Sequence, residues 1–458
     1  MLHFRKLFYR FRRFWGHFSP MQIIVLVFIA IILAGALLLM LPIASKSREA
    51  TPFLTALFTA TSCTCVTGLS LVDTGTYWST FGHGVMLCLI QVGGLGFMTI
   101  MTLFFLLAKR RIGLKERLVM AQSLGMEDLN GIVLMVKKVL IRTLIVEGAG
   151  ALLLAIRFCF QMPVGKAIWW GVFHSVSAFC NAGFDLLGAV EAGGSLVTCV
   201  ADPVINVVIM SLIVLGGLGF FVWEDVLINR RFRRLSVHSR LVLLISGVLL
   251  VGGTALFAVL EWNNPATLGS LSVGEKLLAA AFQSVTVRTA GFYTIPQGAL
   301  TSASKAVSDV LMLIGGSSGS TAGGVKTVTV GVLLLSVLAT ARGKTHVTAF
   351  RRTIRSGQIR DAVAIVAMVF LVAFGAGVYL SAANGLAFAD CIYETISAIA
   401  TVGLSTGLTA SVNVLSKLIL IVLMFFGRVG IMTISLGFLL SDRAEERYCW
   451  AETKVLIG

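Results

Sequence analysis

The sequence predicts an all-α membrane protein in which four fused span–pore-helix–span repeats surround one central pore. Three observations lead to this fold class: the composition, the placement of charge, and a motif that occurs four times. Of the 458 residues, 57% are hydrophobic and only 13% are charged, whereas soluble domains carry about 25% charged residues. The runs 21–41, 241–260 and 362–380 contain no charged residue, and a helix needs about 20 residues to cross a bilayer.

The net charge of +16 is concentrated in short segments between the apolar runs. Cytoplasmic loops of membrane proteins carry such an excess of Lys and Arg, so we expect these segments and both termini to be cytoplasmic. The loops between these segments carry acidic residues instead. This alternation of charge argues against nucleic acid as a partner, and we expect membrane lipid to surround the protein. The basic groups are Arg5, Lys6, Arg10, Arg12 and Arg13; Lys109, Arg110, Arg111, Lys115 and Arg117; Arg230, Arg231, Arg233, Arg234 and Arg240; and Arg342, Lys344, Arg351, Arg352 and Arg355.

A short motif occurs four times at similar spacing. It consists of an aromatic residue, a variable, a small and a variable residue, a hydroxyl residue, and, five or six residues later, a glycine followed by Leu or Phe. One such glycine alone would be ordinary helix packing, but four copies in register indicate a functional repeat. The copies run 58–69, 173–184, 282–292 and 393–404, and their glycines are Gly68, Gly183, Gly291 and Gly403.

Each repeat has the same order of hydropathy: a long apolar run, a segment of about 12–14 residues ending in the motif, and a second long run. A segment of that length is short for a span and is typical of a re-entrant half-helix. We therefore expect four half-helices and eight full spans, at 21–43, 81–108, 136–158, 203–229, 240–262, 303–340, 361–382 and 413–440. The expected divisions are a cytosolic segment 1–20, pore repeats 21–117, 118–236, 237–345 and 346–440, and a tail 441–458.

The glycine motifs predict a selectivity filter. Non-helical backbone is tolerated in a membrane only where it is buried in protein or lines a watery cavity, so four such segments suggest a shared axis. Glycine lets the backbone turn its carbonyl oxygens toward that axis, and carbonyl rings replace the water shell of potassium. The predicted filter consists of Val66, Thr67, Gly68, Asn181, Ala182, Gly183, Thr289, Ala290, Gly291, Thr401, Val402 and Gly403, with potassium at the four glycines.

The second spans predict a gate below this filter. They align at Gly93-Gly94, Gly216-Gly217, Gly315-Gly316 and Gly427-Arg428, and the third is interrupted by five glycines in ten residues, which cannot hold a continuous helix. Arg428 replaces glycine in mid-span, and a buried charge in a membrane is usually functional. The alternatives are a flexible packing defect and an arginine that snorkels to the interface. The predicted gate consists of Gly315, Gly316, Ser317, Ser318, Gly319, Ser320, Thr321, Ala322, Gly323, Gly324 and Arg428.

At these residues the chain resembles the Trk/Ktr/HKT superfamily of potassium transporters, over nearly its whole length. Gly68, Gly183, Gly291 and Gly403 match the family's four filter glycines, and glycine rather than serine at Gly68 implies potassium over sodium. The span count is similar to that of the Ktr branch. The resemblance implies a homodimer in a bacterial inner membrane, with one pore per subunit and a loop and arginine that obstruct it. It also implies a KtrA-like cytosolic ring of nucleotide-binding RCK subunits, and it leaves open whether sodium is an activator.

The main alternative is a sodium- or proton-coupled potassium symporter, which would need coupling carboxylates near the midplane. The spans offer little beyond Glu147, for which the sequence leaves open a proton relay or a packed ion pair. We expect His174 to pack or to form a hydrogen bond within its half-helix. A membrane enzyme is not expected, because the sequence lacks a zinc motif, a nucleotide-binding loop and paired carboxylates in a span.

Overall fold

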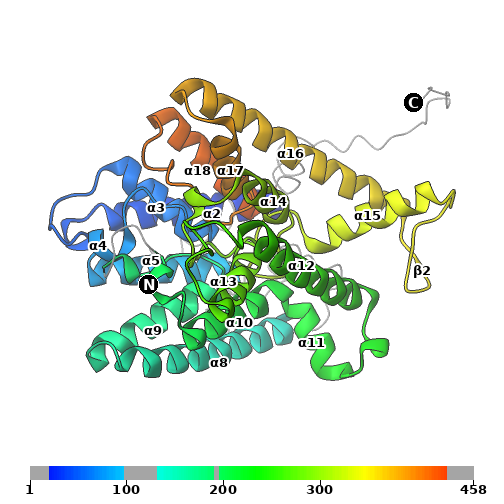
Figure 1. The fold of residues 1–458 in the computed structure, drawn as a ribbon, viewed down its shortest axis with the longest axis horizontal. Coiled ribbons are helices and arrows are strands. Elements are labelled where there is room, and N and C mark those ends of the chain that lie inside the picture. The colour runs from blue at the N-terminus through cyan, green and yellow to red at the C-terminus, as the bar shows by residue number, and fades with distance from the viewer. Residues whose placement is uncertain (1–19, 97–131, 190–194, 431–458) are drawn as a thin grey trace, which may run out of the picture.

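The computed structural model describes residues 20–96, 132–189 and 195–430 (Figure 1). This part of the chain is predominantly helical, as predicted, and contains one small hairpin of strands β1 (Thr348–Ala349) and β2 (Arg352–Thr353). The predicted N-terminal segment, the C-terminal tail and the basic groups at 5–13 and 109–117 lie outside the described residues.

Four long apolar helices each begin a unit of the fold. They are long and apolar enough to cross a membrane, and they coincide with the odd-numbered expected spans to within a few residues, except that they extend further at 132 and 356. Side chains such as Leu37, Val251 and Leu371 are 63%, 73% and 66% exposed, which suits a lipid-facing surface. The helices are α2 (Pro20–Leu39), α8 (Ile132–Cys159), α12 (Val237–Glu261) and α16 (Ser356–Asn384).

A short helix follows each long one and ends shortly before a motif glycine. These helices have 12 to 16 residues, or roughly 18–24 Å of length at 1.5 Å per residue, which is less than the roughly 30 Å of a bilayer core. Each packs extensively against the long helix of its own unit. The short helices are α3 (Phe53–Cys65), α9 (Val164–Phe179), α13 (Val273–Thr286) and α17 (Phe388–Ile399).

In three units the second helix ends at a glycine with φ between 79° and 92° and ψ between 127° and 141°, a conformation that only glycine adopts readily. The segment expected as the span 203–229 is not one straight helix, because α10 and α11 meet at 93° across Gly219. The ends of the expected spans 81–108 and 413–440 lie outside the described residues. The helices are α5 (Thr80–Leu95), ending at Gly96; α10 (Pro203–Leu218), ending at Gly219 before α11 (Phe220–Asn229); and α18 (Val414–Val429), ending at Gly430.

The second helix of the third unit is interrupted, as predicted. Helix α14 (Ser302–Leu313) stops before the glycine-rich loop 315–324, and α15 (Thr327–Ala341) resumes after it. The loop between them contacts other units, since it is hydrogen-bonded to Gly217 of α10 and to Phe179 of α9.

The four units pack into a closed ring. The second helix of each unit contacts the short helix of the next: α5 contacts α9, α10 contacts α13, α14 contacts α17, and α18 returns to α3. Segments far apart in the sequence are thereby brought to a common centre.

Aligned glycines bring the second helices against the ends of the short helices. A Cβ built on Gly93, Gly216 or Gly427 would lie closer than 3.0 Å to a backbone carbonyl oxygen. In each case that carbonyl belongs to the residue four positions before a motif glycine: Thr64, Phe179 and Ile399.

We therefore expect Gly216→Ala to lower the stability of the protein by about 1–3 kcal/mol, as overpacking does. Gly148→Ala on α8 is the matched control, because a Cβ there meets nothing within 4 Å, and alanine in a helix is favoured by roughly 0.5–1 kcal/mol. Thermal unfolding in detergent micelles measures both. A Gly216→Ala protein as stable as the Gly148→Ala protein would contradict this packing.

Candidate functional site

The four glycine segments, 66–68, 181–183, 289–291 and 401–403, have the same unusual backbone. The first residue of each segment is left-handed, with φ between 52° and 66°, and each glycine has φ between 70° and 101°. A left-handed Val or Thr is strained by roughly 1–3 kcal/mol and persists only where the surroundings enforce it. The left-handed first residues are Val66, Asn181, Thr289 and Thr401.

The four glycines form a ring through which the units touch one another. A Cβ built on any of them would lie closer than 3.0 Å to the carbonyl oxygen of the residue preceding the next glycine. The ring therefore has no room for a side chain at these positions. The contacts run from Gly68 to Ala182, from Gly183 to Ala290, from Gly291 to Val402 and from Gly403 back to Thr67.

The hydroxyl of each motif holds the segment that follows it. The N–H groups of Gly68 and Gly403 donate to Ser62 Oγ at 3.0 Å and to Ser397 Oγ at 3.1 Å. In the other two units the hydroxyl bonds the residue after the glycine instead, since Ser177 bonds Phe184 and Thr286 donates to the carbonyl of Phe292. The position of the hydroxyl residue in each motif indicates this role in the sequence, although the hydroxyl residues are not part of the predicted filter.

The second motif position, interpreted as variable from the sequence, is polar in all four copies. In three of them its side chain binds the chain beyond the glycine. His174 Nε2 accepts from Leu186 N at 3.3 Å, and Gln283 exchanges hydrogen bonds with Gln297 at 2.8 and 3.0 Å. Glu394 accepts from Thr409 Oγ1 at 2.9 Å and from Thr406 N at 3.1 Å. The prediction that His174 forms a hydrogen bond in its half-helix is confirmed, because its Nδ1 also bonds the carbonyl of Trp170 at 2.7 Å.

We expect Ser397→Ala to lower discrimination between rubidium and sodium about three- to tenfold. The substitution leaves the buried N–H of Gly403 without its acceptor, which costs roughly 1–3 kcal/mol and loosens the ring. Ser397→Thr keeps a hydroxyl, as Thr286 does in the third unit, and Ser302→Ala removes an exposed hydroxyl at the start of α14. Rubidium uptake with sodium as competitor measures all three, and an Ala variant as selective as both controls would exclude this role.

One cavity of about 300 Å³ opens above the ring and is lined by all four glycines. Two carboxylates, Asp73 and Asp185, also line it. Burial is the main cause that raises the pKa of Asp185 to about 6. Negative charge beside a narrow cavity raises the local concentration of cations.

On the other side of the ring, the glycine-rich loop 315–324 is bound to the bend between α10 and α11. Ser317 N donates to Gly217 O at 3.0 Å, and Phe220 N donates to Gly319 O at 2.9 Å. Thr321 Oγ1 donates to the carbonyl of Phe179 at 3.1 Å, at the end of α9. The loop also reaches the fourth glycine segment, since a Cβ on Gly323 would collide with Thr401 Oγ1.

Arg428 joins this loop to the first unit. Its Nη1 donates to the carbonyl of Thr321, and its Nη2 donates to the carbonyls of Gly93 and Gly94, the latter at 2.9 Å. The predicted partnership between Arg428 and 315–324 therefore exists as a contact. An arginine bound to three carbonyls in the interior does not snorkel to the interface.

Two further cations lie in this region and were not assigned from the sequence. Lys326 Nζ donates to Ala322 O at 2.7 Å, and Arg288 Nη2 contacts the hydroxyls of Ser246 and Thr327. In the described part of the chain, the salt bridges involve Glu224, Asp202 and Asp390 with other partners. Arg288, Lys326 and Arg428 therefore have no carboxylate partner there.

Glu147 is buried between helices but does not form an ion pair with any described residue. Its carboxylate accepts from Gln91 Nε2 at 3.1 and 3.2 Å. Among the described residues the packed ion pair is therefore not formed, and the neutral amide of Gln91 on α5 is the partner of this carboxylate.

Together the fold and the site define a multi-pass helical membrane protein with a polar centre built largely from backbone. The family model for TrkH, described as a cation transport protein, matches residues 17–447. The chain belongs to this family.

Curated relatives match at nearly full length. The chain is 40% identical to the potassium/sodium uptake protein NtpJ of Enterococcus hirae, covering 96% of this chain and 97% of the relative. It is 39% identical to the Ktr system potassium uptake protein B of Bacillus subtilis, covering 95% and 96% of the two chains. The crystal structure of the potassium transporter TrkH from Vibrio parahaemolyticus matches with a TM-score of 0.69 and 18% identity, covering 92% of this chain and 85% of that one. At this identity the structural match shows the fold.

Proposed function

We infer that this protein conducts potassium across a bacterial inner membrane by a channel-like route through the ring of four glycine segments. The observation that carries the proposal is the ring itself, in which each glycine meets the carbonyl that precedes the next. Rings of carbonyls coordinate a dehydrated cation in place of water. The four short helices end directly before these segments, so their partly negative C-terminal ends also favour a cation there.

The proposal assigns potassium rather than sodium as the preferred ion. Both curated relatives carry potassium in their names, and one of them also carries sodium. Glycine occupies all four ring positions here, which supports the potassium assignment.

The gate in this proposal is the loop 315–324, closed by Arg428. The loop crosses from the third unit to α10, α9 and the fourth segment, so it lies across the route below the ring. A positive charge at Arg428 repels a cation while the loop is in place. Opening would move the loop aside on its glycines, as hinge residues do in other gated proteins.

A channel-like route is preferred over coupled symport. Coupling would need an ionisable carboxylate that meets the ion near the midplane. Glu147 is bonded to Gln91 and is not among the residues that line the cavity above the ring.

The proposal includes a homodimer and a KtrA-like cytosolic RCK ring that regulates the gate, with both termini on the cytosolic side. Three relatives are named as parts of a Ktr system. Two of the basic segments meet in space, because Phe232 and Phe350 lie 6.4 Å apart between ring centres and Arg240 stacks on Phe350 at 5.6 Å. This joined basic surface is where we place the partner.

The test is ion uptake by liposomes that contain the purified chain, with and without the partner. We expect rubidium to enter down its electrochemical gradient, with potassium competing and sodium competing poorly. Uptake that requires a sodium or proton gradient would favour the symporter, and equal competition by sodium and potassium would contradict the selective pore.

A further inference from the structure

We propose that Arg288 is a positioning residue that ties the base of the glycine-rich loop to the third glycine segment, so that gate position and ion selectivity are linked. The inference rests on the proposed function. Arg288 lies three residues before Gly291, where the other units have Cys65, Cys180 and Ala400.

The base of the loop is a paired neck. Residues 314–316 lie beside residues 325–327, since Gly315 N donates to Val325 O at 2.9 Å and Thr327 N donates to Gly316 O at 3.0 Å. Thr327 Oγ1 closes the neck by donating to Gly315 O at 2.9 Å. The neck therefore holds the two ends of the loop together, so that a movement of the loop is passed to Thr327.

Arg288 braces this neck from the filter side. Its Nη2 donates to Thr327 Oγ1 at 3.3 Å and to Ser246 Oγ on α12 at 3.2 Å. Since Thr289 follows Arg288 directly and is held in a left-handed conformation, a shift of Arg288 pulls on the glycine segment itself. A continuous path thus runs from Gly315 through Thr327 and Arg288 to Thr289.

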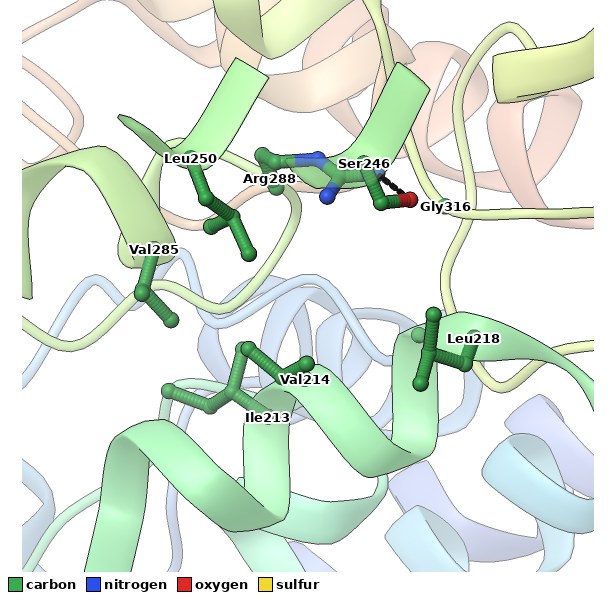
Figure 2. Close-up of a pocket in the computed structure, with 9 residues that line it drawn as sticks. Ile213, Val214, Leu218, Ser246, Leu250, Val285, Arg288 and Gly316 are labelled. Carbon is green, nitrogen blue, oxygen red and sulfur yellow. Dashed lines mark hydrogen bonds between the residues drawn. The ribbon is translucent and has the colours of Figure 1, made fainter. Parts of the chain in front are cut away.

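The surroundings of Arg288 make its position depend on these two hydroxyls. Figure 2 shows Arg288 and Ser246 on one side of a small cavity, with Ile213, Val214, Leu218, Leu250 and Val285 around the rest. The cavity has a volume of about 20 Å³, which suffices for one water, and Gly316 of the loop also lines it. The buried Nε of Arg288 has no partner among the described residues.

An arginine held only by hydroxyls is easily displaced, because neutral acceptors bind a guanidinium less strongly than a carboxylate does. When the loop moves and Thr327 moves with it, Arg288 loses one of its two acceptors and is held by Ser246 alone among these hydroxyls. The ring at Gly291 then relaxes. The gate and the filter are consequently not independent elements.

The test uses Thr327→Val, which has nearly the same shape but lacks the hydroxyl, in liposomes containing the full-length chain. We expect partner-independent rubidium uptake to rise about tenfold, as loss of a hydrogen bond to a charged group allows, and the rubidium-to-sodium ratio to fall several-fold. Thr327→Ser retains the hydroxyl and restores both values. Thr329→Val, two residues further along α15, is the matched control, and we expect it to behave as wild type.

Arg288→Lys provides a second route, because lysine keeps the charge but loses the planar fork; it should give the same two changes. The double variant with Thr327→Val should add little to either single variant. Wild-type uptake or wild-type selectivity in both single variants, or fully additive effects in the double variant, would overturn the link. Absence of selective rubidium uptake in the wild-type protein would instead refute the proposed function.

Discussion

Replacing Arg428 by alanine is expected to raise rubidium uptake through the purified chain, without its partner, by about tenfold or more. Arg428 binds carbonyls of Thr321, Gly93 and Gly94, and hydrogen bonds to charged groups contribute about 1.5–3 kcal/mol each. Their loss releases the loop from the first unit. The substitution also removes a positive charge from the proposed ion route, which lowers the barrier to a cation.

Three comparisons separate release of the loop from general damage. Arg428→Lys keeps a charge but only part of the hydrogen bonding, so its uptake should lie between those of wild type and Arg428→Ala. Deleting residues within 315–324 should act in the same direction as Arg428→Ala. Arg342→Ala removes an exposed charge at the end of α15 and should change nothing. If Arg428→Ala and the deletion both fold, insert and show wild-type or lower uptake, the loop is a packing irregularity and not a gate.

Lys326 allows the contribution of a second cation to the control of uptake to be measured. It donates to Ala322 within the same loop and remains as a second cation when Arg428 is removed. We therefore expect residual control of uptake in Arg428→Ala, with a further rise when Lys326→Ala is added.

The sequence revealed the units of this fold because their signals are local and recur. The four motif glycines are 115, 108 and 112 residues apart, and a long, predominantly apolar helix precedes each. The interruption at 315–324 was equally visible, because several glycines and hydroxyl residues in a row oppose a helix wherever they stand.

Other features depend on contacts between segments that are distant in the sequence, and they had no local signal. Gly219 lies in a continuous apolar run, yet the chain turns there by 93° because the glycine-rich loop bonds to both sides of the bend. Glu147 is matched by Gln91 from another unit, and Arg288 by Thr327. The spacing of these residues in the sequence does not predict that they are in contact.

One group of site residues that was not predicted is nevertheless marked by a pattern in the sequence. The second position of the motif holds Thr59, His174, Gln283 and Glu394, which differ in kind but are all polar at a buried place. Three of them bind the chain beyond the glycine. A polar residue retained on the buried side of an apolar helix indicates a hydrogen-bonding partner, whatever its identity.

Adding one side chain to the ring is expected to have the largest effect on selectivity. In Gly403→Ser the new Cβ would collide with the carbonyl of Thr67, at a backbone φ of 93° that L residues rarely adopt. The carbonyl has to move, and the coordination of a dehydrated ion moves with it. We expect the rubidium-to-sodium ratio to fall at least about tenfold, corresponding to roughly 1.4 kcal/mol.

Gly385→Ser separates the collision from backbone strain. Gly385 ends α16 with φ of 65°, and a Cβ there meets nothing within 4 Å. This variant carries a similar strain without touching the ring, so it should lose some stability and keep its selectivity.

The most direct measurement is therefore the rubidium-to-sodium uptake ratio in liposomes for wild type, Gly385→Ser and the four variants Gly68→Ser, Gly183→Ser, Gly291→Ser and Gly403→Ser. The account predicts a selective wild type, a selective Gly385→Ser and a reduced ratio in every ring variant that inserts. A ratio equal to that of wild type in all four ring variants would contradict the assignment of these glycines to an ion filter.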